Sequence, residues 1–326
     1  MTINQALNRV TDNLSKTSSS PALDSEVILS FVLKKSKEFL FANVNYRLSS
    51  LQATRYSLLA TRRSRGEPIA YLTGHKEFYG LDFRVTPDVL IPRPETELLV
   101  ELALDRIRNI ELRIKNIIDV GTGSGCVMIS LAKKIPPQAC PPRCAWRGRG
   151  GGSGRGRIRI YATDISNPAL KIARLNARHH GVARKIKFVQ GNLLDPFLHL
   201  PLMRGRKSRG HSLILANLPY ITPRKLNNPD LKFEPPSALI GGPDGLKYYR
   251  ALFEQIQNSP FPLFSKRGGA PSLWQREGWD EFILLLEHDP SQVSKLKSLA
   301  KTYFPSPTKI TFHRDLSGRN RVMEIS

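Results

Sequence analysis

Two short stretches of the sequence combine residue types that could hold a ligand and act on it. In "ILANLPYI" at 214–221, an apolar run is followed by an amide, a proline and a phenol. The Asn217 side chain carries an acceptor and a donor, the pair that grips a planar amide or amino group. Pro219 stiffens the turn, so the Leu218 carbonyl can point in a fixed direction, and Tyr220 offers a flat face for stacking. Taken alone, an ordinary turn with a buried tyrosine explains the stretch equally well.

The second stretch is "DVGTGSG" at 119–125, which follows an apolar run and precedes a helical pattern. Glycines at 121, 123 and 125 let the backbone approach a ligand closely. The N-terminus of the following helix offers free amides to a negative group. The spacing is G-x-G-x-G with Cys126 next, whereas the dinucleotide fingerprint is G-x-G-x-x-G. The pattern therefore disfavours a dehydrogenase.

Further candidate ligands follow the next two apolar runs. An acidic residue that holds a ribose normally lies about 20 residues beyond such glycines. Asp164, at the end of "RIYATD", lies further along, and the excess matches the length of an arginine- and glycine-rich segment between them. Asp164 could instead cap the next helix, but Asn167 is better placed for that. In "GNLLDPF", Asn192 either contacts an adenine edge, with Leu193 as an apolar wall, or is an ordinary turn residue.

Short β-branched or leucine-rich runs alternate with helical patterns from residue 91 onward. Such runs indicate a sheet buried on both faces, hence a doubly wound α/β domain whose ligand lies at the carboxyl ends of the strands. The predicted strands are 116–120, 159–163, 186–190, 212–216 and 282–287, and the predicted helices are 125–134, 167–180, 245–257 and 291–302.

The preceding part of the chain has a different pattern. Apolar residues fall at helical spacing over 23–65 with no glycine among them, which predicts a small helical domain within 1–76. "FYGLDFRV" alternates and contains a glycine turn, so we expect a β-hairpin linker at 77–90. The α/β domain then occupies 91–326.

Two segments interrupt the α/β pattern. Residues 139–158 are rich in arginine and glycine and poor in apolar residues, so we expect a disordered insertion. It is either a loop making weak RNA contacts or a tolerated surface insertion, and the second interpretation is favoured because long loops cost little stability. Residues 266–280 form a second expected insertion.

Composition limits the class of protein. The chain has 50 Lys and Arg against 27 Asp and Glu, a formal net charge of +23, which indicates an acidic partner or environment such as nucleic acid or a ribonucleoprotein. Its three cysteines lack a disulfide framework and complete no zinc set, so we expect no metal. No run approaches the roughly 18 apolar residues of a membrane span. Without a coiled coil or repeat, we expect a monomer.

Taken together, the motifs resemble the release-factor glutamine N5-methyltransferases, the HemK or PrmC family. The resemblance covers nearly the whole chain and is most specific in "GEPIAYLTGHKEFYGLDFRVTPDVLIPRPETE" at 66–97, which general DNA or rRNA amino-methyltransferases lack. It implies a Rossmann-like S-adenosylmethionine-dependent methyltransferase domain behind a helical substrate-recognition domain. The implied substrate is the glutamine of the Gly-Gly-Gln motif of a peptide chain release factor, methylated in support of translation termination.

The resemblance also implies roles for individual residues. Asn217, Leu218, Pro219 and Tyr220 would hold the substrate glutamine and carry the catalysis. The donor S-adenosylmethionine would be bound by Gly121, Thr122, Gly123, Ser124, Gly125, Asp164, Asn192 and Leu193. Arg93 and Glu97 would lie over the donor pocket in structural rather than catalytic roles. The sequence has NLPY where the family has NPPY, and we expect the Leu218 side chain to be dispensable because the backbone carbonyl persists.

The start of the chain suggests a location. Residues 1–22 contain a single acid, Asp12, together with Arg9, Lys16 and "TSSS", which is typical of either an organelle transit peptide or a frayed basic terminus. We expect a eukaryotic mitochondrial member of the family, or otherwise a cytoplasmic one. Two other functions compete: a nucleic-acid amino-methyltransferase, and a non-enzymatic RNA-binding protein on a methyltransferase scaffold.

Overall fold

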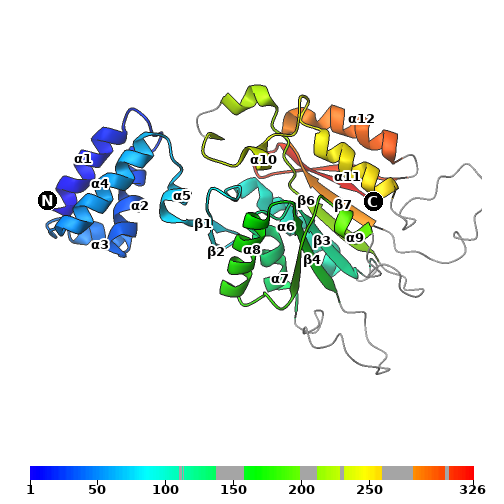
Figure 1. Ribbon diagram of the computed structural model, residues 1–326, viewed down its shortest axis with the longest axis horizontal. Coiled ribbons are helices and arrows are strands. Elements are labelled where there is room, and N and C mark those ends of the chain that lie inside the picture. The colour runs from blue at the N-terminus through cyan, green and yellow to red at the C-terminus, as the bar shows by residue number, and fades with distance from the viewer. Residues whose placement is uncertain are drawn as a thin grey trace, which may run out of the picture.

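The computed structural model describes residues 1–109, 112, 114–136, 158–198, 211–227, 231–258, 282–304 and 308–326. A helical N-terminal part is followed by a hairpin and then by a sheet with helices on its faces (Figure 1). The expected insertion at 266–280 lies outside these residues, as does most of the one at 139–158. Its last residue, Ile158, is described and is buried in the core.

The N-terminal part packs five helices around one apolar core. Ile3, Leu14, Ile28 and Tyr56 are completely buried in it, and the Tyr56 hydroxyl lies 2.8 Å from Ser25 Oγ. The helices are α1 (Ile3–Leu14), α2 (Pro21–Leu33), α3 (Lys37–Ala42), α4 (Ser50–Ser64) and α5 (Ile69–Thr73).

The expectation of a frayed basic terminus is wrong. The first helix, α1, begins at Ile3 with a capping box, in which Thr2 and Gln5 each bond the other's backbone N–H. Four residues of α1 at helical spacing are buried against α2 and α4. The sequence pattern had indicated helix only from residue 23, because the apolar face of α1 is narrow and its other residues are polar.

A two-stranded hairpin joins the parts, with strands β1 (His75–Phe78) and β2 (Leu81–Arg84). Its turn residues Tyr79 and Gly80 both have positive φ, +53° and +71°, as in the turn type whose twist matches antiparallel strands. The chain then runs through a short 3₁₀ turn, η1 (Pro94–Thr96), into α6 (Glu97–Arg108), a helix that the sequence analysis did not predict.

Seven strands form one sheet in the order β5-β4-β3-β6-β7-β9-β8. The five strands from β5 to β7 are parallel, whereas β9 is antiparallel to both neighbours. The strands are β3 (Asn116–Val120), β4 (Arg159–Asp164), β5 (Ile186–Gln190), β6 (Ser212–Ala216), β7 (Phe282–Glu287), β8 (Ile310–Arg314) and β9 (Asn320–Ile325). The predicted α/β class and all five predicted strands are confirmed, and the antiparallel pair β8–β9 was not predicted.

Helices cover both faces of this sheet (Figure 1). The longer ones are α7 (Cys126–Lys134), α8 (Asn167–His179), α11 (Lys247–Gln257) and α12 (Val293–Tyr303). The shorter elements are α9 (Asp195–Leu198), α10 (Pro236–Leu239), η6 (Pro223–Asn227) and η9 (Pro290–Gln292). No helix within the described ranges has the length and apolarity to cross a membrane.

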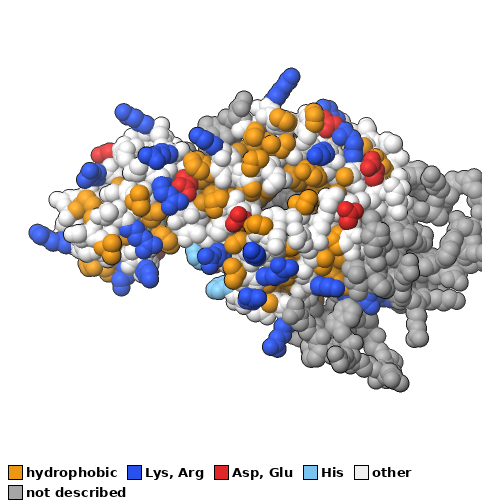
Figure 2. All heavy atoms as spheres, in the orientation of Figure 1, with side chains coloured by type: hydrophobic (Ala, Val, Ile, Leu, Met, Phe, Trp, Pro, Cys, Tyr) orange, Lys and Arg blue, Asp and Glu red, His pale blue; other side chains and the backbone are white. Residues whose placement is uncertain are grey.

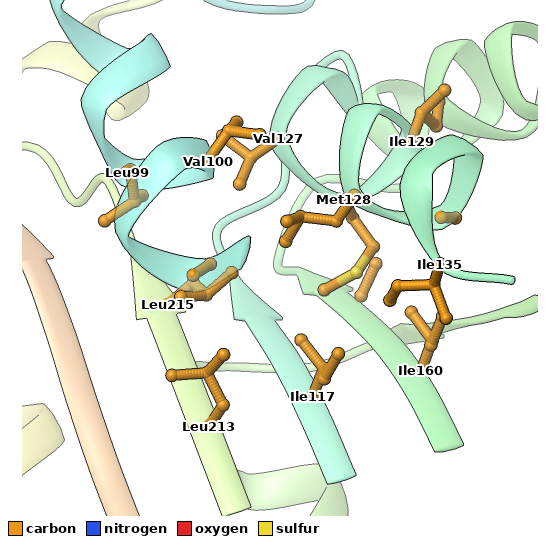
Figure 3. Packing of buried hydrophobic residues seen from close by; sticks show 14 of the residues in the cluster. Leu99, Val100, Ile117, Val127, Met128, Ile129, Ile135, Ile160, Leu213 and Leu215 are labelled. Carbon is orange, nitrogen blue, oxygen red and sulfur yellow. The ribbon is translucent and has the colours of Figure 1, made fainter. Parts of the chain in front are cut away.

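Alternate residues along each central strand enter different cores. Ile117, Leu213 and Leu215 pack with residues of α6 and α7 on one face (Figure 3). Ile118 and Ile214 pack with α11 and α12 on the other. Strands buried on both sides read as continuous apolar runs, and this is why the sequence identified them so closely.

Leu14→Ala should destabilise the protein because it leaves a cavity where a fully buried side chain packs α1 into the helical core. We expect a loss of about 2–5 kcal/mol in the free energy of unfolding of this part, measured by denaturant titration. Leu51→Ala is the matched control, since Leu51 is 79% exposed, and it should change stability by no more than about 0.5 kcal/mol. Equal effects of the two changes would contradict the placement of α1 in the core.

Candidate functional site

The two stretches singled out in the sequence lie side by side at the carboxyl edge of the sheet. Strands β3 and β6 are parallel neighbours, and Val120 is the register partner of Ala216. The chain leaves β3 toward β4 on one side and reaches β6 on the other, so this is the topological switch point where open α/β sheets bind ligands. A Cβ atom on Gly121 would lie 3.6 Å from Leu218 Cδ2. The glycine loop and the turn therefore touch.

Three left-handed glycines shape the loop after β3. Gly121, Gly123 and Gly125 have φ of +73°, +54° and +83°, a region that other residues rarely adopt. Gly125 directly precedes α7 and packs closely against Ala173 of α8, where an added Cβ would lie 3.2 Å from the alanine Cβ. Nothing lies within 4 Å of a Cβ on Gly123. The loop therefore packs closely against α8 at Gly125 and has open space beside Gly123.

The buried carboxyl of Asp119 is hydrogen-bonded to the glycine loop. Asp119 is 3% exposed and accepts a hydrogen bond of 2.6 Å from the Thr122 hydroxyl. Burial raises the pKa of Asp119 to about 7, the Thr122 bond opposes that rise, and the negative charge of Asp164 adds to it. Thr122 also donates its backbone N–H to the Thr163 carbonyl at 2.8 Å. These bonds fix Thr122 within the loop.

Asp164 is positioned to accept from a ligand. Its two carboxylate oxygens accept backbone N–H bonds from Gly123 at 2.9 Å and Ser166 at 2.8 Å. Burial raises its pKa, and these backbone bonds oppose the rise. Each oxygen has a second lone pair that can receive a hydroxyl donor. The expected helix cap was wrong: Ser166 caps α8 by accepting from the Ala169 N–H, and Asn167 is the first helical residue.

The loop after β5 places its two predicted residues differently. Leu193 is buried with φ of +51°, and its carbonyl accepts a 3.1 Å bond from the Thr163 hydroxyl. Asn192 is exposed, and its backbone carbonyl accepts from Gln255 Nε2 at 3.4 Å. Leu193 therefore shares a bonding partner with the glycine loop, and the Asn192 side chain lies at the surface.

The turn after β6 is fixed by contacts with other segments. Asn217 Nδ2 donates to Thr96 Oγ1 at 3.1 Å. The Leu218 side chain is 2% exposed and packs in the core beside Tyr161 and Leu246. The expectation that this side chain is dispensable is therefore wrong, because it fills the space between the turn and the glycine loop.

The back of the turn rests on the loop at 241–245. The Ile221 N–H donates to the Leu239 carbonyl at 2.8 Å, and the Gly241 N–H returns a bond to the Ile221 carbonyl at 2.9 Å. Gln292 Nε2 donates to the Tyr220 carbonyl at 3.1 Å. Burial raises the pKa of the half-buried Tyr220, so its hydroxyl is neutral at physiological pH. The turn is thus held as a rigid unit.

The segment "IPRPETE" at 91–97 is anchored by a buried acid from a distant part of the chain. Glu234 is 2% exposed, accepts the Ile91 N–H at 3.0 Å and pairs with the Arg93 guanidinium. Glu97 accepts the Tyr79 N–H at 2.8 Å. Arg93 and Glu97 thus hold the segment in place, and Thr96 of this segment lies within hydrogen-bond distance of Asn217.

Sequence reasoning missed Thr96, Asp119 and Glu287 as parts of this site. Glu287 ends β7 and is 1% exposed, and the nearby Thr96 hydroxyl opposes the rise that burial causes in the pKa of its carboxyl. A signal was present in the sequence, because Glu287 ends the apolar run "FILLLE" just as Asp164 ends "RIYATD". Among the described residues, no group of three His, Cys, Asp or Glu is arranged to hold a metal ion.

Comparison with known proteins identifies the family. Residues 5–74 match the family model described as the PrmC N-terminal domain. Over 324 residues, the chain is 36% identical to the release factor glutamine methyltransferase of Coxiella burnetii, covering 99% of this chain and 98% of that protein. The chain belongs to the release factor glutamine methyltransferase family.

A second relative agrees with this assignment. The release factor glutamine methyltransferase of Moorella thermoacetica is 39% identical over 255 residues, which cover 77% of this chain and 79% of that protein. Among solved structures, the ribosomal protein L11 methylase of Lactobacillus delbrueckii subsp. bulgaricus aligns with 72% of this chain and 79% of its own, at 17% identity and a TM-score of 0.39. The two family relatives are bacterial proteins, so they give no support to the expected eukaryotic mitochondrial membership.

Gly241→Ala should displace the turn that carries Asn217. An added Cβ would collide with the Pro219 carbonyl oxygen and lie 2.7 Å from Tyr220 Cα, and both neighbours are backbone that cannot move alone. We expect a loss of about 1–3 kcal/mol in the free energy of unfolding, with shifted NMR resonances for the Asn217 side-chain amide. Ser237→Ala, at an exposed position nearby, is the control. Unchanged Asn217 resonances in the Gly241 variant would contradict the close packing.

Proposed function

We propose that this chain transfers a methyl group from S-adenosylmethionine to the side-chain nitrogen N5 of the glutamine in the Gly-Gly-Gln motif of a peptide chain release factor. The observation that carries the proposal is similarity at 36% identity along essentially the full length of a release factor glutamine methyltransferase. The geometry agrees, because an amide-bearing turn lies against a glycine loop at the switch point of the sheet. The activity supports translation termination.

The residues at the glycine loop fit the methyl donor. S-adenosylmethionine, when bound, supplies an electrophilic methyl group on a sulfonium sulfur. Asp164 would accept the ribose hydroxyls, because each of its oxygens makes one backbone bond and retains a lone pair. The glycine loop, from Gly121 to Gly125, would line the methionine and ribose parts, with its open side at Gly123. Leu193 and Asn192 would contact the adenine.

The turn after β6 would orient the substrate amide. The lone pair of a primary amide nitrogen is delocalised into its carbonyl, so the nitrogen is a poor nucleophile. Asn217 Oδ1 and the Leu218 carbonyl accept its two N–H bonds and align the lone pair with the methyl group, while the Tyr220 ring packs against the amide plane. Positioning supplies most of the catalysis. No general base is required, because the methylated nitrogen loses its proton after transfer.

The helical N-terminal part would recognise the release factor. It is the part that matches the PrmC N-terminal domain. On the face shown in Figure 2, Lys and Arg side chains are spread over both parts of the molecule rather than gathered into one patch. This distribution suits a general attraction to acidic partners more than a defined nucleic-acid groove. The weak RNA contact and the monomeric state that the sequence suggested remain predictions.

The two competing functions are not favoured. A nucleic-acid amino-methyltransferase would share the turn and the glycine loop, but the full-length relatives are named for release factors. A non-enzymatic scaffold would have no need of the bonds that fix Asn217 and Asp164.

Asn217→Ala should lower the rate of methyl transfer to a release factor by about 100-fold or more, because the acceptor that orients the amide is lost. The Kd for S-adenosylmethionine should stay within about twofold, since Asn217 binds the substrate side. The measurement is transfer of labelled methyl groups to purified release factors, with calorimetry for donor binding. A release factor with its motif glutamine changed to alanine should accept no methyl group.

Asn258→Ala, at an exposed amide at the end of α11, serves as the control for the substitution itself and should keep wild-type turnover. Wild-type turnover by the Asn217 variant would overturn the mechanism. Labelling of RNA or DNA, without labelling of any release factor, would overturn the function.

Residence in a mitochondrion remains part of the proposal, resting on the acid-poor start and the net charge of +23. The start also has a structural role, because α1 is packed in the helical core. A fluorescent fusion of the full chain, expressed in a eukaryotic cell, should localise to mitochondria, and a diffuse cytosolic signal would contradict the prediction.

A further inference from the structure

A buried carboxyl lies behind the catalytic turn with no role in the mechanism above. Strand β7 pairs with β6, and Leu286 is the register partner of Ala216. Glu287, the last residue of β7, therefore lies at the level where Asn217 follows β6. Glu287 is 1% exposed, and within the described part of the chain its Oε2 atom has no hydrogen-bond partner. An unpaired carboxyl in such a place is costly, which calls for a functional reason.

Thr96 connects this carboxyl to the turn. Asn217 Nδ2 donates to Thr96 Oγ1 at 3.1 Å, and Thr96 lies close enough to Glu287 for its hydroxyl to lower the pKa of that carboxyl. A hydroxyl has one proton to donate. Because a carboxylate only accepts, the Thr96 proton points to Glu287, and Thr96 Oγ1 must then accept from Asn217. The amide nitrogen of Asn217 is thereby held toward Thr96, and its Oδ1 atom is turned the other way.

We propose that Glu287 is a positioning residue that acts through Thr96 to fix which end of the Asn217 side chain meets the substrate amide. The proposal rests on the function proposed above, in which Asn217 Oδ1 must accept a substrate N–H. Without the carboxylate, the Thr96 hydroxyl is free to donate to Asn217 Oδ1. The Asn217 side-chain amide then rotates by half a turn, so that its N–H group faces an N–H group of the substrate amide and no hydrogen bond forms.

The surroundings of Glu287 make its charge state sensitive to pH. Burial raises its pKa to about 7, while the Thr96 bond and the charges of Arg321 and Arg93 oppose the rise and Glu95 adds to it. The other groups around it keep one state near that pH. Burial raises the pKa of Tyr220, Tyr249 and Cys126 and lowers that of His288. Burial also acts to raise the pKa of Asp289, but hydrogen bonds with Lys225 and Ser291 outweigh it and lower that pKa to about 2. Near this pH, Glu287 therefore changes between an ionised form, which holds Asn217 in the orientation required for substrate binding, and a protonated form, which does not.

The first test is kinetic. Glu287→Gln and Thr96→Val should each lower kcat by about tenfold, with the Kd values for S-adenosylmethionine and the release factor within about twofold of wild type. The double variant should lose no more than either single one, because both changes break the same relay. Thr96→Ser keeps the hydroxyl and should restore turnover. Glu324→Gln changes a buried carboxyl paired with Arg106 and should leave kcat unchanged.

The second test follows pH. Wild-type kcat should fall as the pH is lowered from about 8 to about 6, because protonated Glu287 can donate to Thr96 and release its proton toward Asn217. The Glu287→Gln profile should lack this step. The pKa of Asp119 is also raised to about 7. A step in the pH profile of kcat caused by Asp119 would remain in Glu287→Gln, so the comparison distinguishes it from the step caused by Glu287.

Measurements that require no methyl transfer distinguish the role proposed for Glu287 from the methyltransferase function itself. The pKa of Glu287 is higher in the folded chain than its ordinary 4.5. The folded state therefore holds this proton longer, and wild-type stability relative to Glu287→Gln should decline from about pH 4.5 to about 7 and then level off. NMR should show the Asn217 side-chain amide shifting with the same titration. If wild type methylates no release factor yet these shifts occur, the proposed function fails and the relay stands.

Three results would overturn the relay. They are wild-type kcat in Glu287→Gln, losses that multiply in the double variant, and an Asn217 amide whose resonances do not follow Glu287. A general folding defect would instead lower the melting temperature of Glu287→Gln at all pH values and leave its remaining kcat with the wild-type pH profile.

Discussion

The parallel pairing of β3 with β6 is the constraint on which the site depends. It sets Val120 opposite Ala216, so the loop that follows one strand must lie beside the turn that follows the other. Hydrogen bonds along both strands and apolar cores on both faces fix this register. A slip of one residue would exchange the faces of the strand. The spacing between the glycine loop and the turn is therefore set by the sheet.

Acidic side chains at the same edge give the site its polarity. Asp164 and Glu287 are the last residues of β4 and β7, Asp119 is the last but one of β3, and burial raises the pKa of each. Each is tied to a short polar partner or to backbone N–H groups rather than to a neighbouring cation. Such bonds orient hydroxyls and amides strongly in a poorly solvated environment. The acids thus act on the geometry of the loops around them.

The turn after β6 also depends on segments far away in the chain. Thr96 reaches Asn217 because Glu234 anchors Ile91 and Arg93. Gly241 and Gln292 support the other side of the turn. The turn is thus held from outside, and the Leu218 side chain packs against the glycine loop. Rigidity is supplied by tertiary contacts where the local sequence supplies less.

The sequence by itself determined the α/β class, the positions of five strands and the residues of the glycine loop and turn. Continuous apolar runs, glycines and a proline leave few conformations, and these signals are local. Only the tertiary structure decided the place of α1, the cap by Ser166, the packing of Leu218 and the contact of Thr96 and Glu287 with Asn217. Each of these depends on which atoms from distant segments meet in three dimensions. A hydroxyl or carboxyl has many possible partners along a chain, and burial selects one.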